Sequence, residues 1–195
     1  MSVNGPPRIL ICTHQPGTVA EMRTLLAGSG CELTFHQLAN SDPERPSGYK
    51  LLLVDGGPAA TSLDLCRRLR ERTDPVFIPL LYVSSEPETG ARSSVFESGA
   101  DAYLARPFAP GELLAQVHAL FRVKDAYDRL AGRSAEMLRI NKRLQQLHQQ
   151  IDHEMQLAQR IQASFLPQSL PDVPHGRFAV HYLPRDRVGG DFYDV

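Results

Sequence analysis

Leu51-Leu52-Leu53-Val54-Asp55 is the stretch that decides the fold, and Gly56-Gly57-Pro58 follows it directly. Four apolar residues in a row predict a short strand that is buried on both faces, as in the parallel sheets of α/β proteins. Asp55 stands at the carboxyl end of this strand, just before a loop. Open α/β sheets place their ligand chemistry at that edge. The chemistry available to Asp55 therefore depends on the side chains that neighbouring loops bring beside it.

Apolar runs of this kind alternate with helical patterns over residues 8–122. The predicted strands lie at residues 9–12, 31–35, 51–54, 78–83 and 102–104. The predicted helices lie at residues 19–26, 61–72, 91–98 and 111–121, and the proline-containing stretch 37–48 predicts only a short or distorted helix. This alternation predicts an α/β fold, a five-stranded parallel sheet that is doubly wound, with helices on both faces.

The bulk properties exclude several classes of protein. The chain has 195 residues, enough for one domain of usual size and an appendage, and its formal net charge of −1 gives no reason to expect nucleic acid or an anionic membrane as a partner. Its apolar runs fall far short of the roughly 20 residues that span a bilayer. The N-terminus shows no secretory signal. Three widely spaced cysteines favour reduced thiols, and we expect a cytoplasmic protein without a membrane segment.

Three further loops are expected at the same edge of the sheet as Asp55. Ser84 follows the fourth predicted strand, and Gly99-Ala100-Asp101 leads through the fifth strand to Arg106-Pro107-Phe108. This set resembles the receiver domain of response regulators over nearly all of residues 8–122. The resemblance implies that Asp55 holds the phosphoacceptor position, Ser84 the switch hydroxyl and Arg106 the position of the family's lysine. It also implies a histidine kinase or another signalling protein as partner.

The loop after the first strand departs from the receiver pattern. Receivers carry there a pair of acids that binds Mg²⁺, whereas this chain has Thr13 and His14. Hydroxyl and imidazole groups are poor ligands for that hard cation. We therefore expect a pseudo-receiver, in which Asp55 hydrogen-bonds to Ser84, Arg106 or loop amides. In the alternatives, Asp55 accepts phosphate with Arg106 or His14 partly replacing the missing charge, or His14 senses pH.

From about Val123 the apolar residues recur every seven positions as far as Phe165, with a second row three residues further on that Arg133 and Glu154 interrupt. Sustained heptads predict a coiled-coil signalling helix over residues 123–166 and a homodimer, with either helix direction compatible with the pattern. The alternative is one amphipathic helix folded back on the domain. The predicted core residues of the coil are Leu130, Met137, Ile140, Leu144, Leu147, Ile151 and Ile161.

The C-terminal part carries a second resemblance. Residues 154–167, which contain Ala158-Gln159-Arg160-Ile161-Gln162 and Leu166-Pro167, precede Val188-Gly189-Gly190-Asp191. These segments resemble the start of bacterial PPM-type Ser/Thr phosphatases of the sporulation and stress-response class. The resemblance implies that Asp191 is one ligand of a pair of Mn²⁺ or Mg²⁺ ions. Residues 167–195 are then a linker and the truncated start of a phosphatase domain, with a strand predicted at residues 178–182.

One carboxylate cannot hold two metal ions, so we expect no catalytic residue, no cofactor and no phosphatase activity in this chain itself. In a chain without the rest of that domain, Asp191 is expected to be an exposed turn residue. The hypothesis is the regulatory region of a bacterial two-component, partner-switching response regulator. Its phosphatase substrate would be an anti-sigma-factor antagonist. The alternative is a non-enzymatic docking and dimerisation module. His153-Glu154 resembles the phosphorylated motif of histidine kinases, but a solvated histidine on the helix surface is expected.

Overall fold

The structure is a computed structural model, and it describes residues 5–37, 46–56, 59–84, 91–167, 169, 174, 179–183 and 188–189. The chain divides into two compact units, Met1–Ala131 and Gly132–Val195. Helix α4 (Pro110–Phe165) contributes to both of them. Across the described ranges, no helix is long and apolar enough to cross a membrane.

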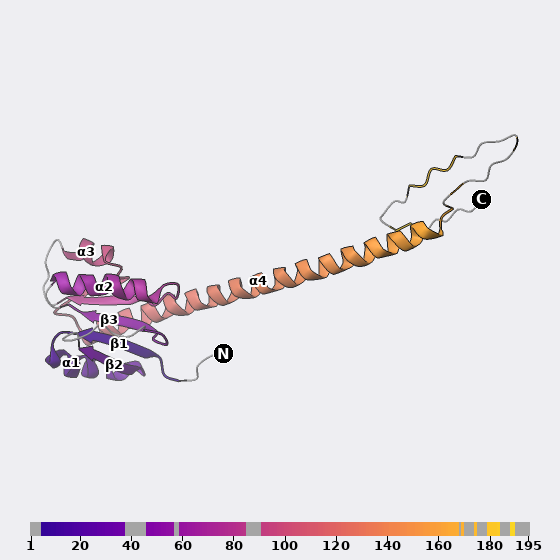
Figure 1. Ribbon diagram of the computed structural model, residues 1–195. Helices are drawn as coiled ribbons and strands as arrows, with labels where there is room; N and C mark the ends of the chain where they lie inside the picture. Colours follow the sequence, from indigo (N-terminus) through magenta and orange to yellow (C-terminus); the bar gives the residue numbers. More distant parts are fainter. Residues whose placement is uncertain are drawn as a thin grey trace. The chain divides into compact units, whose positions relative to one another are not determined.

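The first unit is built on a sheet of five parallel strands (Figure 1). The strands are β1 (Arg8–Thr13), β2 (Glu32–Gln37), β3 (Leu51–Asp55), β4 (Leu80–Ser84) and β5 (Ala102–Ala105), in the spatial order β2-β1-β3-β4-β5. Asp55 pairs in register with Val83, so β3 and β4 end at the same edge of the sheet. The predicted five-stranded, doubly wound α/β fold is confirmed.

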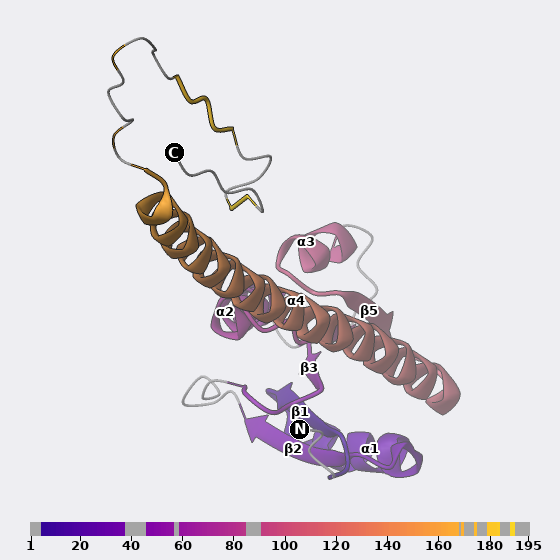
Figure 2. The same cartoon turned by 90° about the vertical axis from the view of Figure 1, so that its right-hand side faces the viewer.

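Helices cover both faces of the sheet, and alternate residues of each central strand point to opposite faces. Helix α1 (Pro16–Leu26) and the start of α4 cover one face, and α2 (Ala59–Thr73) and α3 (Ala91–Glu97) cover the other (Figures 1 and 2). In β3, for example, Leu51 and Leu53 belong to the first core, and Leu52 and Val54 belong to the second. All four side chains are fully buried, which explains the unbroken apolar run in the sequence.

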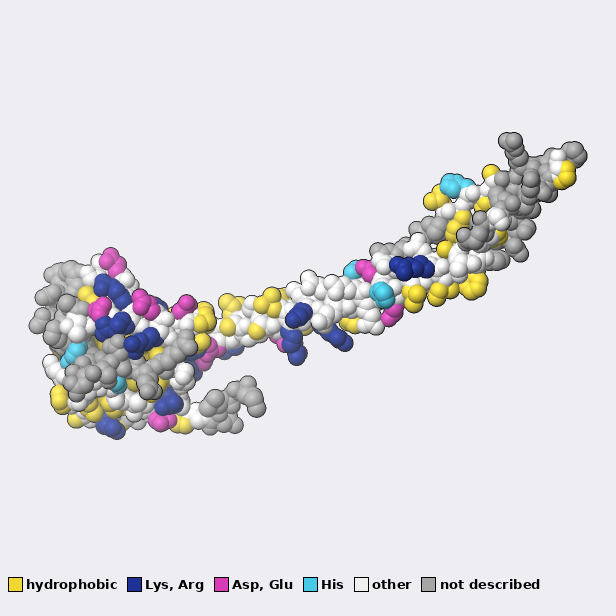
Figure 3. Space-filling view, viewed as in Figure 1, with side chains coloured by type: hydrophobic (Ala, Val, Ile, Leu, Met, Phe, Trp, Pro, Cys, Tyr) yellow, Lys and Arg dark blue, Asp and Glu magenta, His cyan; other side chains and the backbone are white. Residues whose placement is uncertain are grey.

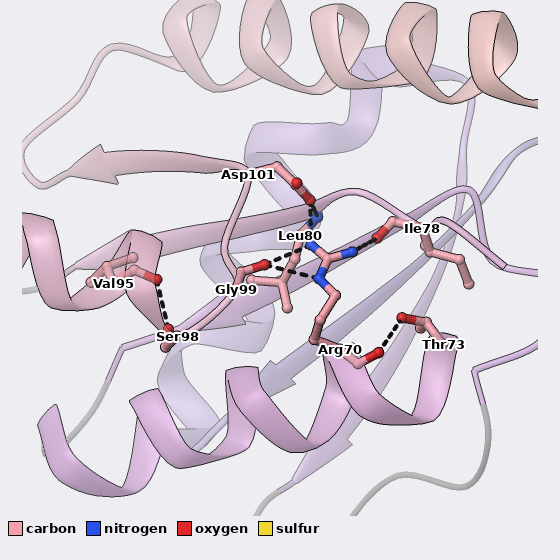
Figure 4. Close-up of polar contacts among 8 residues, drawn as sticks. All are labelled: Arg70, Thr73, Ile78, Leu80, Val95, Ser98, Gly99 and Asp101. Carbon is pink, nitrogen blue, oxygen red and sulfur yellow. Dashed lines mark hydrogen bonds and ion pairs between the residues drawn. The ribbon is translucent and has the colours of Figure 1, made fainter. Parts of the chain in front are cut away.

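A polar cluster ties α2 to the loops before β4 and β5 (Figure 4). Asp101 Oδ2 accepts hydrogen bonds from Arg70 Nη2 at 2.6 Å and from the Leu80 backbone amide at 2.8 Å. Arg70 also donates to the carbonyl oxygens of Gly99 and Ile78. Gly99 has a φ of +99°, and a Cβ there would lie 3.2 Å from Arg70 Cβ. Glycine is therefore suited both to the backbone conformation and to the close approach of α2.

The first unit also fixes the early part of α4. Leu113, Val117, Leu120 and Phe121 are buried against the sheet. Lys50 Nζ lies 2.8 Å from the Asp125 carboxylate and 5.0 Å from the centre of the Phe121 ring. The Phe77 and Tyr127 rings lie 4.9 Å apart. These contacts hold α4 to the domain for one to two turns beyond residue 122, where the sequence had predicted the domain to end.

In the second unit, α4 runs unbroken to Phe165. The predicted core residues of the coil are all exposed in the single chain, by between 39% for Leu147 and 70% for Met137. Figure 3 shows hydrophobic side chains gathered along this part of the helix. No strand occupies the described residues 179–183, so the strand predicted at 178–182 is wrong for that part. Asp191 lies outside the described residues, and so do residues 38–45 of the stretch 37–48, for which a short or distorted helix was predicted. The described residues 46–48 of that stretch are not helical.

Candidate functional site

Asp55 is the centre of the candidate site and is only 4% exposed. It ends β3, where the strand gives way to the loop that begins at Gly56. The Thr13 hydroxyl, at the end of the neighbouring strand β1, donates to Asp55 Oδ2 at 3.0 Å. The same hydroxyl accepts a hydrogen bond from the Gln15 backbone amide at 3.0 Å, which orients it within the loop. Thr13 is fully buried, so this contact forms away from bulk water.

Arg106 neutralises the second oxygen of Asp55. Its Nη1 atom donates to Asp55 Oδ1 at 2.7 Å, and its Nη2 atom donates to Glu21 Oε2 on α1 at 3.1 Å. Burial alone would lower the pKa of Arg106, but the hydrogen bonds and charges of Asp55 and Glu21 outweigh it, and the pKa is raised. The guanidinium is therefore a permanent cation between two carboxylates, and both oxygens of Asp55 have donors from within the domain.

Ser84 and His14 complete the edge of the site. Ser84 is buried at the end of β4, and its carbonyl oxygen accepts the backbone amide of Arg106 at 3.0 Å, which holds the β5 exit beside β4. His14 follows Thr13 and is partly exposed. Its Nε2 atom is buried and has no hydrogen-bond partner in the described part of the chain. Thr13 and Arg106 thus both contact Asp55, as their positions at the same edge of the sheet predicted.

The Tyr82 side chain lies close to the backbone of Gly56, the residue that follows Asp55. A Cβ atom on Gly56 would lie 2.5 Å from Tyr82 Oη, so only glycine fits there without a shift of the ring. Burial raises the pKa of the Tyr82 phenol, and the nearby Cys66, Tyr103 and Asp55 raise it further against a lowering hydrogen bond with Ser62. Tyr82 stacks with Tyr103, with ring centres 6.3 Å apart. The Tyr82 ring therefore lies close to the backbone at Gly56, directly after Asp55.

The donor atoms around Asp55 do not fit Mg²⁺. Such a site needs carboxylate oxygens and retained water molecules in octahedral geometry. Here the oxygen from β1 is a hydroxyl that is already committed to Asp55, and the cation beside the carboxylate is Arg106. Within the described ranges, no group of three His, Cys, Asp or Glu residues could hold a metal ion. The described residues around Asp55 therefore supply no ligand set for a bound magnesium ion.

The sequence analysis placed Thr13, Asp55 and Arg106 at this site and missed Glu21, which forms an ion pair with Arg106. Thr13, Asp55 and Arg106 follow strands, whereas Glu21 lies in the middle of α1 and is exposed. A signal existed, because Arg106 carries two separate donor groups and Asp55 satisfies only one of them. Nothing in the local pattern of residues 16–26 indicates which helix supplies the second acceptor.

Comparison with known proteins agrees with this geometry, although no family model matches the chain. It is 32% identical over 103 residues to the phosphate regulon transcriptional regulatory protein PhoB of Rhizobium meliloti, covering 52% of this chain and 41% of that protein. It is also 32% identical over 139 residues to the response regulator MprA of Mycolicibacterium vanbaalenii, covering 68% of this chain and 57% of that protein. The chain thus spans about half the length of these relatives.

A solved structure shows the same fold. A response regulator receiver domain protein from Clostridium thermocellum superimposes with a TM-score of 0.54 at 15% identity, covering 62% of this chain and 98% of that one. The first unit thus has the doubly wound fold of that receiver domain, with a carboxylate at the end of its central strand. Together with the two relatives, this shows that the chain contains a response-regulator receiver domain.

Proposed function

We propose that this chain is the regulatory region of a partner-switching response regulator, in which the receiver domain controls a C-terminal metal-dependent Ser/Thr phosphatase through a dimeric helix. The observation that carries the proposal is the continuity of α4. One helix begins in the receiver core at Pro110 and ends at Phe165, immediately before the Leu166-Pro167 linker that resembles the start of a phosphatase domain. A continuous helix transmits rotation or translation along its length because its backbone hydrogen bonds make it stiff.

In this proposal Asp55 is a structural group of a pseudo-receiver. Thr13 and Arg106 already donate hydrogen bonds to both oxygens of the carboxylate. Transfer of a phosphoryl group depends on neutralising the charge of the incoming group, and the described residues around Asp55 offer no ligand set for the ion that would do so. The receiver domain would therefore act through its surface, with a histidine kinase or another signalling protein as the partner class.

The dimer supplies the second part of the mechanism. The predicted core residues of the coil form an apolar row on α4 that the single chain leaves exposed. A second copy of the chain would bury this row, since identical heptads are complementary to each other. Arg133 and Glu154 interrupt the row and weaken its packing, so the two helices could shift relative to each other at low cost. Such an adjustable coil suits a signalling helix.

The phosphatase assignment is tested on a longer chain that carries the sequence following Val195. Purified protein with Mn²⁺ is expected to release phosphate from a phosphoserine substrate, with an anti-sigma-factor antagonist as the substrate class. Asp191→Asn is expected to abolish this release, because it would remove a carboxylate ligand of the metal pair. Asp172→Asn, in the linker, is the matched control. Absence of metal-dependent release in every state of the longer chain would overturn the assignment.

The second candidate function is a non-enzymatic docking and dimerisation module. The same exposed row on α4 favours it, because that row requires only a partner helix and no catalytic domain. The phosphatase measurement separates the two functions. A longer chain that dimerises but releases no phosphate with Mn²⁺ or Mg²⁺ would support the docking module.

A further inference from the structure

Gln162, in the last turn of α4, holds a segment from 27 residues further along the chain. Its Nε2 atom donates to the Gly189 carbonyl oxygen at 2.6 Å, and its Oε1 atom accepts the Gly189 backbone amide at 3.1 Å. Nε2 also donates to the Tyr182 hydroxyl at 2.9 Å. The residues involved all belong to the second unit.

The three hydrogen bonds engage both N–H groups and the carbonyl oxygen of the Gln162 side-chain amide. A glutamine amide carries two N–H donors and one carbonyl acceptor, and both donors and the acceptor are engaged here. It pairs with the Gly189 peptide group much as one strand pairs with the next, but through a side chain. This pairing needs a side chain that carries both a donor and an acceptor and that is as long as glutamine. Neither alanine nor a carboxylate at position 162 could reproduce it.

We propose that Gln162 is a positioning residue that fastens the Gly189 peptide group to the end of α4. Gly189 stands two residues before Asp191 in the sequence. The consequence for metal binding rests on the proposed phosphatase function, whereas the clamp itself rests only on the contacts of Gln162. This clamp, the Gln162 clamp, consists of the three hydrogen bonds that join Gln162 to Gly189 and Tyr182.

Through the Gln162 clamp, a movement of the end of α4 would also move the Gly189 peptide group. Ile161, directly before Gln162, belongs to the exposed apolar row and is 50% exposed. Successive residues of an α-helix lie about 100° apart around its axis, so the packing of Ile161 in a dimer fixes the direction in which Gln162 points. A change in how the two helices pack would therefore reposition Gln162 and the Gly189 peptide bound to it.

The clamp is tested on the present chain by amide hydrogen exchange, measured by NMR. In Gln162→Ala the Gly189 amide loses its acceptor, and we expect it to exchange roughly fivefold faster, the effect of losing about one net hydrogen bond. Gln159→Ala is the matched control, because it makes the same change one turn earlier on an exposed part of α4. Tyr182→Phe removes only one contact and should give a smaller change.

The exchange result decides whether the clamp exists. Faster exchange at Gly189 in Gln162→Ala, with Gln159→Ala like the wild type, supports it. Unchanged exchange in Gln162→Ala, or an equal change in Gln159→Ala, overturns it. Circular dichroism of both variants establishes that α4 is intact, so that a loss of helix is not taken for a loss of the clamp.

The coupling to metal is tested separately on the longer chain. Gln162→Ala should raise the Mn²⁺ concentration needed for half-maximal phosphate release several-fold, while Gln159→Ala should not. An unchanged Mn²⁺ requirement in an active protein would overturn the coupling. If the longer chain releases no phosphate in any form, the proposed function fails, and the exchange measurement alone still decides whether Gln162 holds Gly189.

Discussion

Arg106 Nη1 lies 2.7 Å from Asp55 Oδ1, so a cation from the β5 exit occupies the space beside the carboxylate that ends β3. In a receiver that binds Mg²⁺, a metal ion would sit near this carboxylate and acids from the β1 loop would hold it. Here the β1 loop presents the Thr13 hydroxyl, which bonds to the other oxygen of Asp55. In the proposed pseudo-receiver, the pairing of Asp55 with Arg106 and Thr13 takes the place of the ion, and substitution of these residues tests this proposal.

The first prediction concerns phosphorylation of Asp55. Treatment of the wild-type chain with a small acyl phosphate and Mg²⁺ should add no phosphoryl group, because Thr13 and His14 stand where an acid pair would bind the metal ion. The variant with Thr13→Asp, His14→Asp and Arg106→Lys restores the acid pair and frees space beside the carboxylate. It should gain one phosphoryl group, measured by intact mass, and the further change Asp55→Asn should remove it.

Two results would count against this account. A phosphorylated wild-type chain would show that Arg106 or His14 replaces the metal. A triple variant that folds, as judged by circular dichroism, but stays unmodified would show that more than the acid pair is missing from the site.

The second prediction concerns stability at the same site. Arg106→Ala should lower the free energy of unfolding by about 1–3 kcal/mol, because it leaves a buried carboxylate with Thr13 as its remaining described donor. Asp55→Asn should cost less, since Arg106 keeps Glu21 as its partner and the asparagine keeps an acceptor oxygen. Urea unfolding followed by circular dichroism measures both. A larger loss in Asp55→Asn than in Arg106→Ala would contradict the assigned pairing.

The strands could be predicted because burial on both faces leaves a direct trace in the sequence. Leu51–Val54 and Leu80–Val83 are unbroken apolar runs, and the structure places β3 and β4 over them. The contact of Asp55 with Arg106 followed from the fold, because parallel strands end at a common edge. Glu21 could not be found in this way, since an exposed acid on α1 has the same local pattern whether or not it bonds to Arg106.

The end of the receiver domain on α4 was harder to locate. Buried residues such as Val117 and exposed residues such as Leu130 recur with the same helical spacing, so the sequence alone does not mark where the helix leaves the sheet. The predicted strand at residues 178–182 failed for a different reason. Alternating residues form a strand only when a neighbouring strand supplies hydrogen bonds, and residues 179–183 have no assigned strand to pair with in the described structure.

The third prediction concerns the cluster in Figure 4. Asp101→Ala should destabilise the chain by about 1–3 kcal/mol, because the Leu80 amide and Arg70 lose a shared acceptor in a partly buried setting. Asp64→Ala removes the partner of Arg68 in a more exposed pair within α2 and should cost less than about 0.5 kcal/mol. Urea unfolding compares the two variants. Equal losses would mean that the Asp101 cluster adds nothing beyond an ordinary surface ion pair.

The fourth prediction concerns alkaline pH. Burial raises the pKa of the Cys66 thiol from 9.0 to about 11, against smaller lowering effects of the Ser98 hydrogen bond and nearby arginines. The unfolded chain therefore loses the thiol proton at lower pH than the folded chain. The stability linked to Cys66 is complete below pH 9 and is lost as the pH rises towards about 11. The total loss should be on the order of 3 kcal/mol at most.

Urea unfolding between pH 8 and pH 11 measures this slope, and Cys66→Ala is the control. The variant should be less stable at pH 8, where the cavity costs packing energy, and should lose stability less steeply above pH 9. Parallel slopes for the two proteins would show that Cys66 titrates alike in the folded and unfolded chains.

The last prediction concerns the helix dimer. Leu144 is 58% exposed and stands at the centre of the apolar row on α4. Leu144→Asp should convert a dimer into a monomer, because two carboxylates would meet in the core of the coil without partners. Gln149→Asp places the same charge on the same helix, but off the row, and should leave the dimer intact. Light scattering at micromolar concentration distinguishes the two masses. A wild-type chain that is monomeric there would contradict the dimer, and the exposed row would then need a different partner.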